Sequence, residues 1–179
     1  QTGKVPGDLW LYQELLTQHK PDLIIETGTH WGGSALYLAT ICSLLNHGEV
    51  LSIDLFHKDP LPTHERITYL QGSSVSSEIN DKVTKIVGEN KKVLVILDSD
   101  HTREHVEKEL KIYSKFIRKG DLLIVEDTFL GGHPSHPEHG EGPTEAIEKF
   151  LQENSEFYID KTCEKFLFTL NYNGFLKRK

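Results

Sequence analysis

Short apolar runs that alternate with helix-forming segments are the feature that most constrains the fold of this chain. Five runs have the length and composition of buried strands: Leu23–Ile25, Val50–Asp54, Ile67–Leu70, Val93–Leu97 and Leu122–Val125. Segments with helical spacing lie before and between them, at Asp8–His19, Ser34–Leu45, Val75–Val87, Thr102–Ile117 and Pro143–Leu151. This alternation predicts an α/β fold with a largely parallel sheet and helices on both faces.

The last part of the chain predicts how the sheet ends. Phe157–Asp160 and Phe166–Asn171 have strand patterns, and residues 161–164 between them suit a turn, so we expect an antiparallel hairpin that brings the sheet to seven strands. Because the chain has 179 residues, we expect a single domain over 1–179, in which residues 1–20 form an N-terminal helical segment.

The charge balance and the length of the apolar runs exclude several classes of partner. The chain has 27 acidic and 20 basic residues, which disfavours an extended nucleic-acid surface. Val93–Leu97 and the other apolar runs are too short to cross a bilayer, so no membrane partner is expected. Cys42 and Cys163 lack metal or disulfide spacing, which favours a reducing, cytoplasmic location. A homo-oligomer is compatible with the sequence.

Acidic residues and a glycine follow the predicted strands directly. Ligands of open α/β sheets bind outside the carboxyl ends of the strands. The residues at those ends are Glu26, Asp54, Gly72, Asp98 and the pair Glu126-Asp127. We therefore expect one functional site along this edge of the sheet.

A glycine-rich turn follows the first strand and precedes its helix. Its glycines allow a close approach of the backbone to a ligand, and the start of the helix adds free N–H groups. The spacing Gly-x3-Gly-Gly is neither the dinucleotide fingerprint nor a P-loop. A tight turn without a ligand is the alternative. We expect cofactor contacts from Glu26, Gly28, Thr29, His30, Gly32, Gly33 and Ser34.

The acid at the end of the second strand indicates which cofactor the turn binds. The Asp54 carboxylate can accept hydrogen bonds from both hydroxyls of a ribose. An acid after strand one, glycines, and an acid after strand two together resemble the cofactor site of S-adenosylmethionine-dependent methyltransferases. A short-chain dehydrogenase would need glycine in place of Ser34 and a tyrosine with lysine four residues later, and the sequence has neither.

Carboxylates and a histidine follow the predicted strands Val93–Leu97 and Leu122–Val125. Asp98-Ser99-Asp100-His101 and Glu126-Asp127 would converge because neighbouring strands lie about 4.8 Å apart. Carboxylates without thiolates suit a hard cation such as Mg²⁺, and His101 could remove a proton from a substrate hydroxyl near neutral pH. Capping of the following helix or turn by Asp98 and Asp127 is the alternative.

The segment His101–His105 also reads as the zinc pattern His-x-x-Glu-His. We disfavour zinc because His101 falls in a strand–helix turn and because Glu104 is placed to pair with Lys108. His105 is more typical of a helix surface.

A long loop rich in glycine, histidine and proline covers residues 128–143 and begins directly after the proposed metal acids. Loops of this length in compact domains are commonly functional. We expect a lid that excludes water from the acceptor site, with an ordinary surface loop as the alternative.

Taken together, these motifs resemble those of the cephalosporin hydroxylase family of class I S-adenosylmethionine-dependent methyltransferases, over nearly the whole chain. The motifs that carry the resemblance are Pro6–Trp10 with Tyr12–Glu14, Glu26–Gly28 with Gly32–Ala35, Leu97–His101, Val125–Thr128, Gly131–Pro134, Gly142-Pro143 and Glu164–Leu167. The resemblance implies a Rossmann-like methyltransferase sheet. It also implies that Gly72, Ser73 and Ser74 lie near the adenine.

The chain is similar, more distantly, to metal-dependent O-methyltransferases of the catechol type. Their acid-x-Gly-x3-Gly-x-Ser turn is matched by Glu26, Gly28, Gly32 and Ser34. This similarity implies metal ligands at Asp98, Glu126 and Asp127, with Asp100 as a substitute for Asp98. It implies that His101 is the general base, where catechol enzymes have lysine. Asp98 is also expected to contact the cofactor.

The expected function is methyl transfer from S-adenosylmethionine to a hydroxyl of a sugar or natural-product small molecule, assisted by Mg²⁺ or another divalent cation. A metal-dependent hydrolase that uses the same acids and histidine is one alternative. A catalytically silent protein that binds S-adenosylmethionine is the other.

Overall fold

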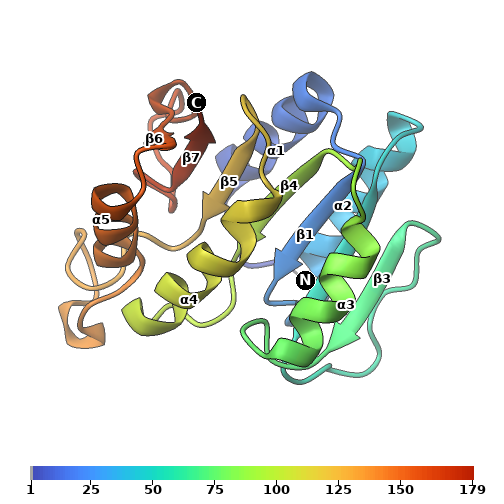
Figure 1. Cartoon of the computed structure of the whole chain (residues 1–179), viewed down its shortest axis with the longest axis horizontal. Coiled ribbons are helices and arrows are strands. Elements are labelled where there is room, and N and C mark those ends of the chain that lie inside the picture. The colour runs from blue at the N-terminus through green and yellow to red at the C-terminus, as the bar shows by residue number, and fades with distance from the viewer. Residues whose placement is uncertain (1) are drawn as a thin grey trace.

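The computed structural model describes residues 2–179, so Gln1, the first residue of the expected N-terminal segment, lies outside the described residues. A seven-stranded sheet with the order β3-β2-β1-β4-β5-β7-β6 forms its centre (Figure 1). The strands are β1 Leu23–Thr27, β2 Glu49–Asp54, β3 Ile67–Gln71, β4 Val93–Leu97, β5 Leu122–Val125, β6 Phe157–Ile159 and β7 Phe175–Arg178. The first five are parallel, and β7 runs antiparallel between β5 and β6. The predicted fold class is confirmed.

Helices cover both faces of this sheet. They are α1 Pro6–His19, α2 Gly33–Leu44, α3 Ser77–Val87, α4 Arg103–Tyr113 and α5 Pro143–Glu153, and short 3₁₀ turns span Ser114–Phe116, Pro137–His139 and Lys161–Cys163. One core lies between the sheet and α3, α4 and α5, and a second lies between the sheet and α1 and α2 (Figure 1). Every residue of β4 is buried, since both of its faces are covered, and this explains its unbroken apolar sequence.

The expected final strand over Phe166–Asn171 is wrong. This segment is irregular, and the side chains of Leu167 and Phe168 within it are exposed. The last strand is β7, whose Phe175 and Leu176 are buried. Its basic side chains are compatible with a strand because Lys177 and Arg178 form ion pairs with Asp160 and Glu156.

The strand register aligns the carboxyl ends of the central strands. Thr27 of β1 lies opposite Ile53 of β2 and Leu97 of β4, and Leu97 lies opposite Val125 of β5. The residues that follow these strands therefore meet at one edge of the sheet, as the sequence predicted.

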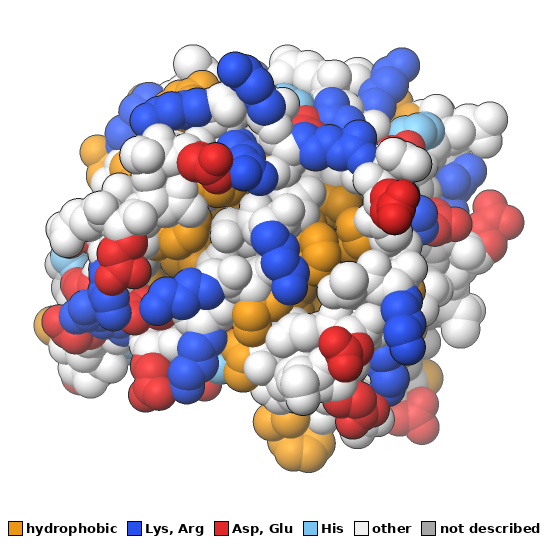
Figure 2. Space-filling view, in the orientation of Figure 1, with side chains coloured by type: hydrophobic (Ala, Val, Ile, Leu, Met, Phe, Trp, Pro, Cys, Tyr) orange, Lys and Arg blue, Asp and Glu red, His pale blue; other side chains and the backbone are white. Residues whose placement is uncertain are grey.

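The surface over α3, α4 and α5 carries basic and acidic side chains in alternation (Figure 2). Within residues 2–179, no helix has both the length and the apolar character needed to cross a membrane.

Candidate functional site

A cavity of about 590 Å³ opens at the carboxyl edge of the sheet. Most of the residues expected at the site line it: Gly28, Thr29, His30, Gly33, Ser34, Asp54, Gly72, Ser73, Ser74, Asp98, Asp100, His101, Glu126 and Asp127. Glu26 and Gly32 are not among its lining residues. Thr2, Gly3 and Lys4 add a wall that the sequence did not predict.

The glycine turn packs tightly against the end of β4. Gly28 has a φ of 92°, and a Cβ atom added there would lie 1.8 Å from the carbonyl oxygen of Asp98. Gly32 caps α2 in the left-handed region with a φ of 70°. At Gly28 a side chain is therefore excluded by the neighbouring backbone as well as by the φ angle.

We expect Gly28→Ala to lower the free energy of unfolding by about 2 kcal/mol or more, because the two backbone segments must separate. Thermal unfolding measures this effect. Gly88→Ala provides the control, since Gly88 also has a positive φ but no atom lies within 4 Å of its added Cβ. Equal losses in the two variants would contradict a packing role for Gly28.

Glu26 lies beneath the glycine turn and is completely buried. Its Oε2 atom accepts a hydrogen bond of 2.7 Å from the Ser52 hydroxyl, whereas Oε1 has no partner among the described residues. Burial raises the pKa of Glu26.

Asp54 is held at the cavity by two backbone N–H groups. The N–H of His30 lies 2.8 Å from Oδ2, and the N–H of Phe56 lies 3.2 Å from Oδ1.

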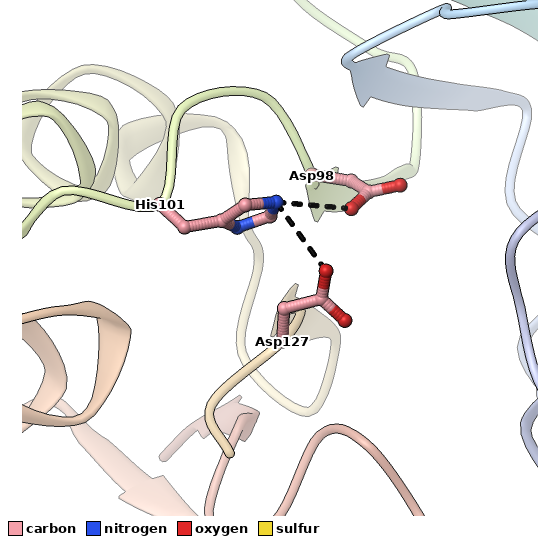
Figure 3. Close-up of side chains that lie close together, drawn as sticks. All are labelled: Asp98, His101 and Asp127. Atoms are coloured by element: carbon pink, nitrogen blue, oxygen red, sulfur yellow. Dashed lines mark ion pairs between the residues drawn. The ribbon is translucent and has the colours of Figure 1, made fainter. Parts of the chain in front are cut away.

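Asp98, His101 and Asp127 form a compact group at the ends of β4 and β5 (Figure 3). The His101 Nε2 atom lies 3.3 Å from Asp127 Oδ2 and 3.9 Å from Asp98 Oδ1. One ligand atom from each residue lies within 4.8 Å of the other two, so the group could hold a metal ion. The backbone of Asp127 has a φ of 54°, in the left-handed region that few residues other than glycine adopt. Asp100 lines the cavity, and its Oδ1 accepts a hydrogen bond of 2.9 Å from the Thr102 N–H, which forms a turn directly before α4.

Glu126 and Asp98 share a buried cationic partner, Lys4, which the sequence did not predict. The Lys4 ammonium group lies 2.6 Å from Glu126 Oε1 and 2.7 Å from Asp98 Oδ2, and its side chain is 5% exposed. Tyr12 donates a further hydrogen bond of 2.7 Å to Glu126 Oε1. The only sequence signal for Lys4 was indirect, because buried acids need a cationic partner.

Burial and the neighbouring charges shift the pKa values of Glu126, Asp98 and Lys4. Burial and the Asp98 carboxylate raise the pKa of Glu126 to about 7, although Lys4 opposes this effect. Burial likewise raises the pKa of Asp98 to about 6. Burial disfavours the charged form of Lys4, but the negative charges of Glu126 and Asp98 outweigh it and raise the pKa of the ammonium group.

A chain of hydrogen bonds connects this group to the C-terminal part of the protein. The Asn171 side chain donates to the Tyr12 hydroxyl at 3.1 Å and accepts the Asp127 N–H at 3.1 Å. Asn171 is fully buried. The irregular segment that replaces the expected strand therefore positions Asp127 and Tyr12.

The expectation that His105 lies on the helix surface is wrong. Its ring lines the cavity, with Nε2 3.5 Å from Glu109 Oε1. The predicted ion pair between Glu104 and Lys108 is present at 2.7 Å.

Within residues 2–179, the cluster Asp98, His101 and Asp127 is the one group of three potential metal ligands.

No residue of the loop at 128–143 is among the residues that line the cavity. Its exposed part is fastened to helices by ion pairs, at 2.6 Å between His133 and Glu145 and at 2.8 Å between Arg103 and Glu141. Its role as a lid stays a prediction.

A family model described as Rhamnosyl O-methyltransferase/CmcI matches residues 2–179. The chain belongs to this family. The predicted family and the predicted enzyme class, a methyltransferase, are therefore confirmed.

Two relatives show how closely the chain follows the Rhamnosyl O-methyltransferase/CmcI family. The rhamnosyl O-methyltransferase of Mycobacterium leprae (strain TN) is 38% identical over 182 residues, which cover 98% of this chain and 80% of the relative. The rhamnosyl O-methyltransferase of Mycobacterium tuberculosis (strain ATCC 25618 / H37Rv) is 39% identical over 182 residues, covering 98% and 74%.

Solved structures of similar proteins share the fold. A CmcI structure with Mg and SAM has a TM-score of 0.71 at 20% identity, and the match covers 100% of this chain and 74% of CmcI. A MycE methyltransferase structure with Mg, SAH and mycinamycin VI has a TM-score of 0.63 at 19% identity, covering 93% and 48%.

Proposed function

We propose that this enzyme transfers a methyl group from S-adenosylmethionine to a hydroxyl of a sugar or of a sugar-bearing natural product, with a divalent cation such as Mg²⁺. The relatives named for rhamnosyl O-methylation support the sugar acceptor. The observation that carries the proposal is the shared cavity, into which the glycine turn, Asp54 and the Asp98–His101–Asp127 group all open.

The polar groups of the cavity support binding of the methyl donor. The glycine turn exposes backbone close to the cavity, and Asp54 offers carboxylate oxygens to a ribose. Glu26 places an unpaired buried oxygen beneath the turn. Most of the expected cofactor residues line the space that the donor would occupy, namely Gly28, Thr29, His30, Gly33, Ser34, Gly72, Ser73 and Ser74, whereas Glu26 and Gly32 lie behind this wall.

The acid group fits a divalent cation. Asp98 and Asp127 would hold it with oxygen ligands, which Mg²⁺ prefers. Glu126, bound through Oε1 to Lys4 and Tyr12, would contribute as the third acid, and Asp100 is the substitute for Asp98. A bound divalent cation orients a substrate hydroxyl and lowers its pKa.

His101 removes the proton from the acceptor hydroxyl at its Nε2 atom. Asp127, 3.3 Å from Nε2, stabilises the positive charge that the imidazole then carries. Lys4 and Tyr12 hold Glu126 in position and favour its ionised form, against the effect of burial. A donor bound along the glycine turn and Asp54 would supply the methyl group to the acceptor oxygen and leave as S-adenosylhomocysteine, and the cavity would hold the two reactants close together.

Calorimetry with S-adenosylhomocysteine tests the proposal directly. We expect saturable binding by the wild-type enzyme and methylation of a rhamnoside acceptor in the presence of Mg²⁺. No nucleoside binding would reject methyl transfer and would favour the hydrolase alternative. Binding without turnover on any glycoside would favour the silent S-adenosylmethionine-binding protein.

We expect Asp54→Ala to weaken S-adenosylhomocysteine binding roughly tenfold or more, because two hydrogen bonds to a ribose are lost. Calorimetric Kd values measure the effect. Asp59→Ala is the control, since Asp59 is exposed and does not line the cavity. Unchanged affinity in Asp54→Ala would place the ribose elsewhere.

A further inference from the structure

A second polar cluster, built around Glu109 of α4, lies behind the cavity wall that Ser74, Ser99 and His105 form. The side chain of Glu109 is buried, and its Oε1 accepts a hydrogen bond of 2.8 Å from the Ser99 hydroxyl. Its Oε2 has no hydrogen-bond partner among the described residues. A buried carboxylate is costly unless it is paired. The proposed catalytic steps do not use this glutamate.

His105 and Ser74 complete the cluster. The His105 Nε2 atom lies 3.2 Å from the hydroxyl oxygens of both Ser74 and Ser99 and 3.5 Å from Glu109 Oε1. The hydrogen bond with Glu109 raises the pKa of His105. Tyr113 donates a hydrogen bond of 2.9 Å to the Ser74 carbonyl oxygen, which holds Ser74 against the helix. Ser74, Ser99 and His105 all line the cavity.

The hydrogen-bond direction in this cluster is fixed by Glu109. A carboxylate only accepts hydrogen bonds, so the Ser99 hydroxyl donates its one hydrogen to Glu109. Ser99 can then offer only lone pairs toward the cavity. A ligand N–H donor is matched at this position, whereas a ligand carbonyl oxygen meets an acceptor and loses its hydrogen bond.

We propose that Ser99, oriented by Glu109, recognises the exocyclic amino group of adenine and selects a 6-aminopurine nucleoside over a 6-oxopurine. The inference rests on the proposed function, because a ribose at Asp54 with the methyl donor facing His101 leaves the Ser74–Ser99–His105 wall for the base. Glu109 acts through Ser99 and is a positioning residue.

The test compares calorimetric Kd values for S-adenosylhomocysteine and S-inosylhomocysteine. We expect the wild-type enzyme to prefer the adenine compound by about tenfold or more. Glu109→Gln should reduce this preference, because an amide can donate to Ser99 and release the hydroxyl hydrogen toward the cavity. Glu107→Gln is the control, since Glu107 lies on the same helix but pairs with Arg103 and Lys149 and does not line the cavity.

Equal wild-type affinity for the two compounds would overturn the inference and leave the proposed function intact. A folded Glu109→Gln variant with undiminished preference would also overturn it. If that variant does not fold, Ser99→Ala decides, because it removes the acceptor and should abolish the preference. Failure of the wild type to bind either compound would reject the proposed function together with the inference.

Discussion

His101→Gln is expected to lower kcat for methyl transfer by about 10²- to 10⁴-fold, the contribution typical of a positioned general base. The imidazole is the one nitrogen base in the group that His101 forms with the Asp98 and Asp127 carboxylates. Glutamine preserves polarity and approximate size but cannot take the proton. The Kd for S-adenosylhomocysteine should change little, because the loss concerns the chemical step.

Steady-state kinetics on a rhamnoside acceptor measures kcat, and calorimetry measures the Kd for S-adenosylhomocysteine. His47→Gln is the matched control, since His47 pairs with Asp22 near the amino ends of the strands, away from the cavity. A His101→Gln enzyme with wild-type kcat would remove His101 from the mechanism. Parallel loss of Mg²⁺ binding would instead assign His101 as a cation ligand.

Lys4→Met is expected to lower the free energy of unfolding by about 3 kcal/mol, which corresponds to a Tm lower by about 6 to 12 °C. Methionine fills the same volume but leaves Glu126 and Asp98 without the ammonium group that contacts both. Removing one partner of a buried ionic group is strongly destabilising because the remaining charges keep their desolvation cost. Protonation of Glu126, whose pKa is already raised to about 7, limits the loss.

Differential scanning calorimetry measures this loss. Lys82→Met provides the control, since Lys82 pairs with Glu78 on the exposed side of α3 and screening by solvent makes such pairs weak. We expect almost no change in its Tm. Equal Tm values for the two variants would show that Lys4 does not stabilise the buried acids.

The sequence predicted the parts of this site that follow from local patterns. Apolar strands followed by acids placed Asp54, Asp98 and Asp127 at one edge, because parallel register brings strand ends together. Lys4 was missed because its partners lie at the ends of β4 and β5, far along the chain. No local pattern encodes such a contact.

Two errors share a different physical cause. His105 was expected on the helix surface, whereas its ring turns toward Glu109 and the hydroxyls of Ser74 and Ser99. The last strand was expected at Phe166–Asn171, whereas the strand that forms is β7, whose Lys177 and Arg178 are neutralised by Asp160 and Glu156. Sequence periodicity identifies apolar faces well, but it cannot reveal which polar groups are paired.

The hydrogen bonds that Asn171 forms with the Tyr12 hydroxyl and with the Asp127 N–H can form only late in the synthesis of the chain. Every parallel strand leaves the ribosome before Asn171 does, so the sheet can begin to pair while Tyr12 and Asp127 still lack this partner. The acidic edge is completed only when the C-terminal segment docks against α1. A nascent chain that ends before Asn171 therefore lacks the hydrogen bonds that hold Tyr12 and the Asp127 backbone at this edge.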